Sequence, residues 1–171
     1  IEYVLINTFN PYTQLPINVV LAKALVEKYF KPEGENAPAE FKEGDKILPW
    51  KILASCKGAQ LEGCLYEQLL PFEANSPQAV QNQTPGAKPF RVLLGDFVTT
   101  EDGTGIVHTA PAFGADDFRV GKKYNIGILV MVDREGKFVN GLGEFSNRFV
   151  KNYKDDPNYV DVNVDICMSF S

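Results

Sequence analysis

The chain has 171 residues, of which 44% are hydrophobic and 12% aromatic, and it carries a formal net charge of −5. This composition excludes an intrinsically disordered chain, and the lack of any run of about 18 apolar residues excludes a transmembrane helix and a membrane partner. The acidic balance also disfavours a protein that grips a nucleic-acid duplex over a long footprint, because such complexes need Lys and Arg to neutralise the phosphates.

The first half of the chain predicts short strands separated by polar loops. Alternating apolar residues predict a strand over 1–9, followed by a turn signal at 10–12. Residues 19–30 predict a strand that runs into a short helix, which ends before Pro32. Two loops rich in Pro and polar residues, at 31–46 and 74–89, alternate with strands at 47–54 and 61–72.

The second half predicts a similar mixture of strands and helices. The predicted elements are strands at 90–94, 95–99 and 105–108, a helix from 116 to about 124, a hairpin over 129–139 and a helix over 144–153. The apolar pattern predicts a core that includes Phe90, Leu94, Phe97, Ile106, Val107 and Phe118. Many short strands with a few helices indicate a mainly β fold with α, barrel-like, with helices on its flanks.

The ends of the chain and its cysteines indicate context. The N-terminus has neither an initiator Met nor a basic signal region, so we expect a segment taken from a longer protein. Cys56, Cys64 and Cys167 give an odd count without a CxxC pair. This pattern disfavours a disulfide framework and a zinc site, and it is typical of small apolar side chains in a reducing cytoplasm.

The only histidine, His108, lies in a stretch that also carries two adjacent aspartates. The stretch contains GTGIVHTAP at 103–111 and GADD at 114–117. Glycines let the backbone approach a ligand closely, and the start of a helix offers free N–H donors. The alternative from spacing alone is a tight strand-to-helix connection in which Asp116 or Asp117 caps the helix.

These two strings resemble the signature of the editing domain of isoleucyl-tRNA synthetases. The related valyl and leucyl enzymes share the GTG opening, but the valyl type usually has Lys at position 108 and the leucyl type continues with Met-Ala-Val-Pro. Further matches are KGAQLEGCLYE at 57–67 and FRVLLGDFVTTED at 90–102. The resemblance covers residues 1 to about 166 and favours the isoleucyl member.

The resemblance implies a single editing domain over 1–171, from a longer synthetase whose catalytic domain and threonine-rich segment lie outside this sequence. It implies post-transfer editing, the hydrolysis of valine mistakenly attached to tRNA(Ile). The partners are then the valine-charged 3′ end of tRNA(Ile) and the rest of the synthetase, and the domain is a cytoplasmic monomer. The resemblance implies no cofactor or metal in this domain, since ATP and Mg²⁺ serve the parent enzyme.

The resemblance assigns the catalytic site to Asp117 and His108. It places Asp117 on the α-ammonium group of the mischarged amino acid, which a carboxylate binds well through charge-assisted hydrogen bonds. Asp116 is expected to cap the helix or to be solvated. His108 is expected to line the pocket and limit the size of the side chain; a general-base role is the alternative, since imidazole titrates near neutral pH.

The remaining substrate-binding expectations are Thr109, Gly105 and Phe113. Thr109 would donate a hydrogen bond to substrate or water, and a structural role in a turn is its alternative. Phe113 stands where many bacterial members of the family have histidine. Other functions stay open: a binding-only fragment for the aminoacylated 3′ end, a valyl-type editing domain, or an unrelated β-barrel interaction domain.

Overall fold

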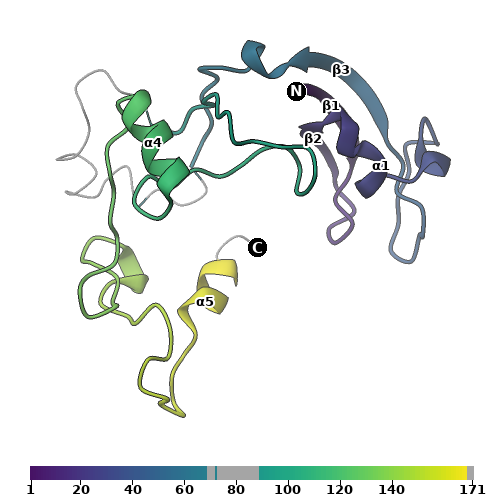
Figure 1. The fold of residues 1–171 in the computed structure, drawn as a ribbon. Helices are drawn as coiled ribbons and strands as arrows, with labels where there is room; N and C mark the ends of the chain where they lie inside the picture. The colour runs from purple at the N-terminus through teal and green to yellow at the C-terminus, as the bar shows by residue number, and fades with distance from the viewer. Residues whose placement is uncertain (69–71, 73–88, 169–171) are drawn as a thin grey trace. The chain divides into compact units, whose positions relative to one another are not determined.

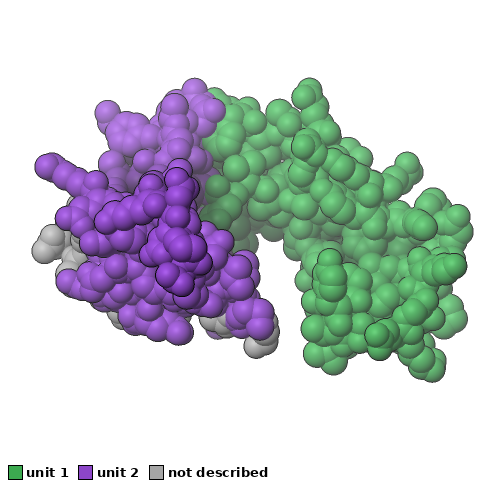
Figure 2. Space-filling model, turned by 90° about the horizontal axis from the view of Figure 1, so that it is seen from below, with its two compact units in different colours: residues 1–64, 92–108 green, residues 65–91, 109–171 purple. Residues whose placement is uncertain are grey.

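The computed structural model describes residues 1–68, 72 and 89–168 (Figure 1). The chain divides into two compact units (Figure 2). The first unit comprises Ile1–Cys64 and Val92–His108, and the second comprises Leu65–Arg91 and Thr109–Ser171. Within the described ranges, no helix is both long enough and apolar enough to cross a membrane.

The first unit is built on an antiparallel sheet of three strands in the order β2-β1-β3. The strands are β1 (Glu2–Phe9), β2 (Pro16–Ala22) and β3 (Lys51–Lys57). Alternation in β1 places Val4, Ile6 and Thr8 in the interior, as a strand with one buried face requires. The predicted strand over 1–9 is therefore confirmed.

A turn and a short helix follow from local chemistry. The Asn10 side chain accepts hydrogen bonds from the backbone N–H groups of Tyr12 and Thr13, which stabilises the turn between β1 and β2. After β2, a 3-10 turn (Lys23–Leu25) leads into α1 (Val26–Tyr29). The predicted strand-to-helix passage before Pro32 is confirmed; Pro32 itself begins another 3-10 turn (Pro32–Gly34).

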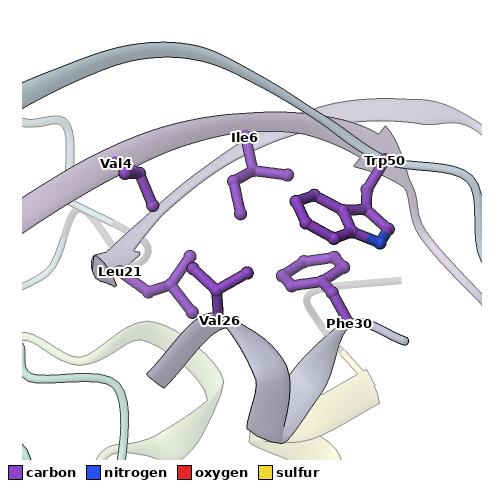
Figure 3. Packing of buried hydrophobic residues seen from close by; sticks show 6 residues of the cluster. All are labelled: Val4, Ile6, Leu21, Val26, Phe30 and Trp50. Atoms are coloured by element: carbon purple, nitrogen blue, oxygen red, sulfur yellow. The ribbon is translucent and has the colours of Figure 1, made fainter. Parts of the chain in front are cut away.

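The core of the first unit lies between β1, β2 and α1. The indole ring of Trp50 packs on the ring of Phe30, with 5.6 Å between centroids (Figure 3). The Trp50 indole N–H donates a 2.8 Å hydrogen bond to the carbonyl oxygen of Lys31, so its polar group is satisfied. The buried cluster comprises Val4, Ile6, Leu21, Val26, Phe30 and Trp50.

The second unit contains two helices and a small core of its own. The helices are α4 (Ala115–Lys123) and α5 (Val162–Met168), and Leu142, Phe145 and Val162 are buried together. The helix predicted from 116 to about 124 is confirmed, whereas α5 was not predicted. The predicted hairpin is confirmed as a turn around the bridge between Val132 and Phe138.

The helix predicted over 144–153 is wrong. Only a 3-10 turn (Gly143–Phe145) forms there, and Asn147 has a φ of 62°, which interrupts a right-handed helix. The backbone that follows pairs with the hairpin instead: the Phe138 N–H donates to the Arg148 carbonyl oxygen at 2.9 Å. Pairing across the hairpin thus replaces the hydrogen bonds that a helix would have made.

Several predicted strands are also wrong, namely 90–94, 95–99, 105–108 and the described part of 61–72. The two segments still pair locally, through an isolated bridge between Leu65 and Arg91 and a few backbone hydrogen bonds around it, but no strand forms. Phe90 has a φ of 60°, so the backbone leaves the extended region where a strand should begin. The strand predicted over 47–54 overlaps β3, which begins and ends a few residues later, at Lys51 and Lys57. Residues 74–88 of the second predicted loop lie outside the described residues.

The predicted core set is wrong as well. Ile106, Val107 and Phe118 are exposed, with relative exposures of 52%, 48% and 46%. Phe90, Leu94 and Phe97 are half-buried. An apolar run is buried only where another layer covers it, and the 105–108 segment forms no strand that a sheet could cover. The described residues thus form a small mixed fold with one open sheet, and they do not show the expected barrel.

Candidate functional site

Residues 102–105, which contain the GTG motif (Gly103-Thr104-Gly105), form a loop in the first unit. This loop is hydrogen-bonded to β1, β2 and α1. Three consecutive carbonyl oxygens of this loop each accept a hydrogen bond. The Tyr29 hydroxyl donates to Gly103 at 2.7 Å, and the Tyr3 hydroxyl donates to Gly105 at 2.6 Å. Between them, the Ala22 backbone N–H donates to the Thr104 carbonyl at 2.8 Å.

An ion pair lies at the N-terminal end of this loop, at Asp102. The Lys28 ammonium group donates a hydrogen bond to the carboxylate of Asp102. This bond from Lys28 lowers the pKa of Asp102 below its ordinary value, and the Gly103 backbone N–H lowers the pKa further. The same contact raises the pKa of Lys28. Both groups are therefore charged at neutral pH, although an exposed pair contributes little stability.

Gly105 is the one loop position where a side chain does not fit. A Cβ atom built on Gly105 would lie 2.6 Å from the Cβ of Ala22. Its φ of 75° is also in the left-handed region, which favours glycine. Gly105 is buried, so it supplies the close approach between loop and β2 rather than an open surface.

His108 is the last residue of the first unit and is exposed. No hydrogen bond or ion pair to its imidazole is found within the described residues. Ile106 and Val107 just before it are also exposed, so two apolar side chains next to the imidazole are accessible. Such a surface can form one wall of an apolar pocket, as a size-limiting role requires.

Asp117 lies in the first turn of α4, in the second unit. It is half-buried, and its carboxylate has no hydrogen-bond or ion-pair partner among the described residues. A Cβ built on Gly114 would lie 2.3 Å from Oδ2 of Asp117. The carboxylate is therefore folded back over Gly114, and the lack of a side chain at position 114 makes this placement possible.

The two aspartates have different environments. Asp116 forms an ion pair with Arg119 one turn along the helix, at 3.0 Å. The helix cap is Gly114, with extended backbone and no capping side chain, so neither aspartate is the N-cap. Both carboxylates still interact favourably with the positive end of the helix. In the described part of the chain, Asp116 therefore has a cation partner and Asp117 does not.

Thr109, Pro111 and Phe113 form the turn that leads into α4. Thr109 is half-buried, and the ring of Phe113 is 69% exposed. The Phe113 backbone N–H donates to the Ala110 carbonyl oxygen at 2.9 Å, which closes the turn. Pro111 packs on the helix at Gly121, where an added Cβ would lie 2.8 Å from its Cγ. The turn and α4 are therefore one local structure.

An open hollow of about 350 Å³ lies beside this turn in the second unit. Its lining includes Pro111 and Ile126 as well as Phe118 and Lys122 of α4, but neither Thr109 nor Asp117. Residues of α4 thus line the hollow, but Asp117, which lies on the same helix, does not. No group of His, Cys, Asp and Glu side chains suited to a metal ion is found in the part of the chain that the structure describes.

Sequence comparison relates the chain to one group of enzymes. The isoleucine–tRNA ligase of Cytophaga hutchinsonii is 48% identical over 162 residues, covering 88% of this chain and 14% of the relative. That of Porphyromonas gingivalis is 45% identical over 168 residues, covering 97% of this chain and 14% of the relative. That of Clostridium novyi is 41% identical over 160 residues, covering 91% of this chain and 14% of the relative.

The chain is homologous to a segment of isoleucine–tRNA ligases. It spans about one seventh of the length of the relatives it matches. No protein-family profile matches the chain. Kinship to isoleucine–tRNA ligases agrees with the resemblance of the 103–117 stretch, and it extends over nearly the whole chain rather than over one motif.

Sequence reasoning missed the residues that hold the GTG loop. Tyr3 and Tyr29 are separated from their hydrogen-bond acceptors by 102 and 74 residues. Lys28 lies equally far from Asp102 in sequence. No local pattern marks these residues, because each would be unremarkable in a strand or a short helix.

Proposed function

We propose that the chain is the post-transfer editing domain of an isoleucine–tRNA ligase, which hydrolyses valine from mischarged tRNA(Ile). The observation that carries the proposal is the half-buried carboxylate of Asp117 at the start of α4, which has no hydrogen-bond or ion-pair partner among the described residues. Support comes from the homology to isoleucine–tRNA ligases and from the GTG motif that precedes the helix. The partners would be the valine-charged 3′ end of tRNA(Ile) and the remainder of the synthetase.

An editing reaction is needed because the difference in binding free energy between isoleucine and valine is small. One methylene group changes the free energy of binding by only about 1–3 kcal/mol, and the isoleucyl enzyme with its substrates is the standard example of this limit. A site that selects isoleucine therefore accepts some valine. A second site that admits valine and excludes isoleucine by size can remove the error by hydrolysis.

In the proposed reaction, Asp117 holds the α-ammonium group of the esterified valine by charge-assisted hydrogen bonds. Water attacks the ester carbonyl carbon and forms a new C–O bond. The bond between that carbon and the ribose oxygen then breaks, so that free valine and a tRNA with an intact terminal hydroxyl are released. The protein forms no covalent intermediate in this scheme and uses no cofactor or metal.

Size selection would come from the segment that ends in His108. Ile106, Val107 and His108 are all exposed, so their side chains are accessible to a bound amino acid. Phe113 and Thr109 would contribute to the substrate-binding surface from the turn before α4. His108 acts here by its volume, because the described residues supply no carboxylate that orients its ring as a base.

The test compares two neighbouring carboxylates of the same helix. We expect Asp117→Asn to slow hydrolysis of Val-tRNA(Ile) by roughly 10- to 100-fold, since a hydrogen bond to a charged group contributes about 1.5–3 kcal/mol. Asp116→Asn is the matched control, because Asp116 is already paired with Arg119. We expect it to stay within about twofold of the parent rate, as surface substitutions usually do. Release of radiolabelled valine measures both.

The same assay separates the other possible functions. Equal loss in both aspartate variants would remove Asp117 from the site. Tight binding of a valyl-adenosine analogue without any hydrolysis would indicate a binding-only module. Hydrolysis of threonine from tRNA(Val), with valine on tRNA(Ile) untouched, would indicate a valyl-type editing domain. We further propose that residues 1–171 belong to a single editing domain, that this domain is a monomer, and that its complete fold is barrel-like.

A further inference from the structure

The loop at 102–105 is held at consecutive backbone positions by donors that come from three different elements. Tyr3 belongs to β1, Ala22 ends β2, and Tyr29 ends α1. Their hydrogen bonds to Gly105, Thr104 and Gly103 are all between 2.6 and 2.8 Å. An ordinary exposed turn makes its hydrogen bonds within itself. This loop makes contacts within itself, such as the Gly103 N–H with Asp102, but three further bonds from neighbouring elements also fix its position.

The hydroxyl groups of Tyr3 and Tyr29 both donate hydrogen bonds to the loop. The Tyr3 side chain is buried, and burial raises the pKa of its hydroxyl, so the group stays a hydrogen-bond donor at neutral pH. Tyr29 is half-exposed, at 46%, yet its hydroxyl donates to Gly103 rather than only to water. Phenylalanine would fill the same volume at both positions. Among the described residues, the hydrogen bond that each of these two hydroxyls donates goes to the loop.

His108 follows the last anchored residue, Gly105, by three positions. Three residues of extended chain span at most about 10 Å, so the anchor limits where the imidazole can lie. The imidazole has no hydrogen bond of its own among the described residues. On the upstream side, the backbone before His108 is held by the bonds from Tyr3 and Tyr29, by the Ala22 N–H, and by the Thr104 hydroxyl, which donates to the Ile106 carbonyl oxygen at 3.4 Å.

We propose that Tyr3 and Tyr29 are positioning residues, whose hydroxyls hold the 102–105 loop so that His108 is presented in one place to the bound amino acid. This inference rests on the editing function proposed above. The two residues touch no substrate themselves. They act on selectivity through His108, and removal of either hydroxyl loosens the wall that should exclude isoleucine.

The test uses Tyr29→Phe and Tyr3→Phe in the full chain, with Tyr12→Phe as the matched control. Tyr12 is 89% exposed, and its hydroxyl makes no hydrogen bond within the described residues. Because His108 is the only histidine, its imidazole gives one unambiguous NMR signal from a histidine-labelled chain. We expect this signal to shift or broaden in both loop variants and to match the parent in Tyr12→Phe.

Deacylation kinetics supply the functional readout. We expect the preference for Val-tRNA(Ile) over Ile-tRNA(Ile) to fall by roughly fivefold in Tyr29→Phe, the size of effect that one lost hydrogen bond produces. The KM for Val-tRNA(Ile) should change little, since Asp117 is untouched. The unfolding midpoint, followed by the fluorescence of Trp50, identifies any variant that simply fails to fold; if Tyr3→Phe does so, the half-exposed Tyr29 decides the question.

The outcomes separate this inference from the proposed function. An unchanged His108 signal in a folded Tyr29→Phe chain would overturn the positioning role, whether or not the chain deacylates tRNA. A changed signal in a chain without any deacylase activity would retain the positioning of His108 and overturn the editing function. A changed signal with unaltered selectivity would show that the anchored loop does not determine which amino acid is accepted, and so would also overturn the inference.

Discussion

The two aspartates at the start of α4 show how one residue can differ from its neighbour in chemistry. Asp116 is exposed and paired with Arg119, whereas Asp117 is folded back over Gly114 without a partner among the described residues. A carboxylate without a cation in the protein is a natural receptor for a ligand ammonium group. Local geometry therefore distinguishes two residues that the sequence presents as a pair.

Gly114→Ala tests this placement of the carboxylate. The new methyl group would collide with Oδ2 of Asp117, the free end of a flexible side chain, so the carboxylate should rotate away. We expect the free energy of unfolding to change by about 1 kcal/mol or less, because the φ of Gly114 is in the extended region that alanine adopts. Hydrolysis of Val-tRNA(Ile) should nevertheless fall as it does in Asp117→Asn. Full activity in a folded Gly114→Ala chain would contradict the placement.

His108→Ala tests the size-limiting role at the same scale. Removal of the imidazole should enlarge the pocket, so that Ile-tRNA(Ile) becomes a substrate while Val-tRNA(Ile) is still hydrolysed. A side-chain difference of one methylene is worth about 1–3 kcal/mol, so we expect a rise of roughly 10-fold or more for the isoleucyl ester. Parallel deacylation assays with both esters measure it. Resistance of the isoleucyl ester, with loss of valyl hydrolysis, would instead favour a general-base role.

Among the elements, β1 has the central place in the first unit. It pairs with β2 on one side and β3 on the other, and its alternating side chains supply much of the buried cluster. β3 differs, because it pairs on one side only and its side chains are almost all exposed. A central strand with one buried face therefore carries the stability of this unit, while the edge strand completes the sheet.

A pair of isoleucines tests this difference. Ile6 of β1 and Ile52 of β3 are opposite each other in the sheet, but Ile6 is fully buried and Ile52 is 43% exposed. We expect Ile6→Ala to lower the free energy of unfolding by about 2–5 kcal/mol, since it leaves a cavity in the core. Ile52→Ala should cost about 1 kcal/mol or less.

Urea titration measures both values through the fluorescence of Trp50. This side chain is the only tryptophan and belongs to the same cluster as Ile6, so the signal reports on the first unit. Similar losses from the two substitutions would mean that the buried face of β1 is not the main source of stability.

For the molecule as a whole, charge and division into units bear on how it meets RNA. The net charge is −5, which does not suit a long contact with phosphates. The stretch from 103 to 117 is also divided between the two units. Its residues up to His108 belong to the first unit, and those from Thr109 belong to the second. The proposed substrate is accordingly a single-stranded end with its amino acid, and not the body of the tRNA.

Direct binding of uncharged tRNA tests this conclusion. We expect the isolated chain to bind uncharged tRNA with a Kd weaker than about 10⁻⁴ M at physiological salt, the weak end of non-specific association. Filter binding at several salt concentrations measures it, with a basic RNA-binding protein as the positive control. A tighter Kd with a steep salt dependence would show that the chain itself grips the tRNA backbone.

Sequence reasoning succeeded where the signal is local. The alternation in β1 predicts its strand, and the pair Asp116-Asp117 predicts the start of a helix; the strand is found, and α4 begins one residue earlier, at Ala115. It failed where a second partner decides the outcome. The residues around Phe90 and 105–108 look like strands but find no regular ladder, and 144–153 pairs with a hairpin instead of forming a helix.

By itself, the amino-acid sequence determined the kinship to isoleucine–tRNA ligases, the first strand, the helices α1 and α4, and the stretch that carries Asp117 and His108. Only the tertiary structure decided that Asp116 and not Asp117 pairs with Arg119 within the described part of the chain, and that Tyr3 and Tyr29 hold the GTG loop. The physical reason is sequence separation: patterns report interactions among near neighbours, whereas these hydrogen bonds join residues 102 and 74 positions apart.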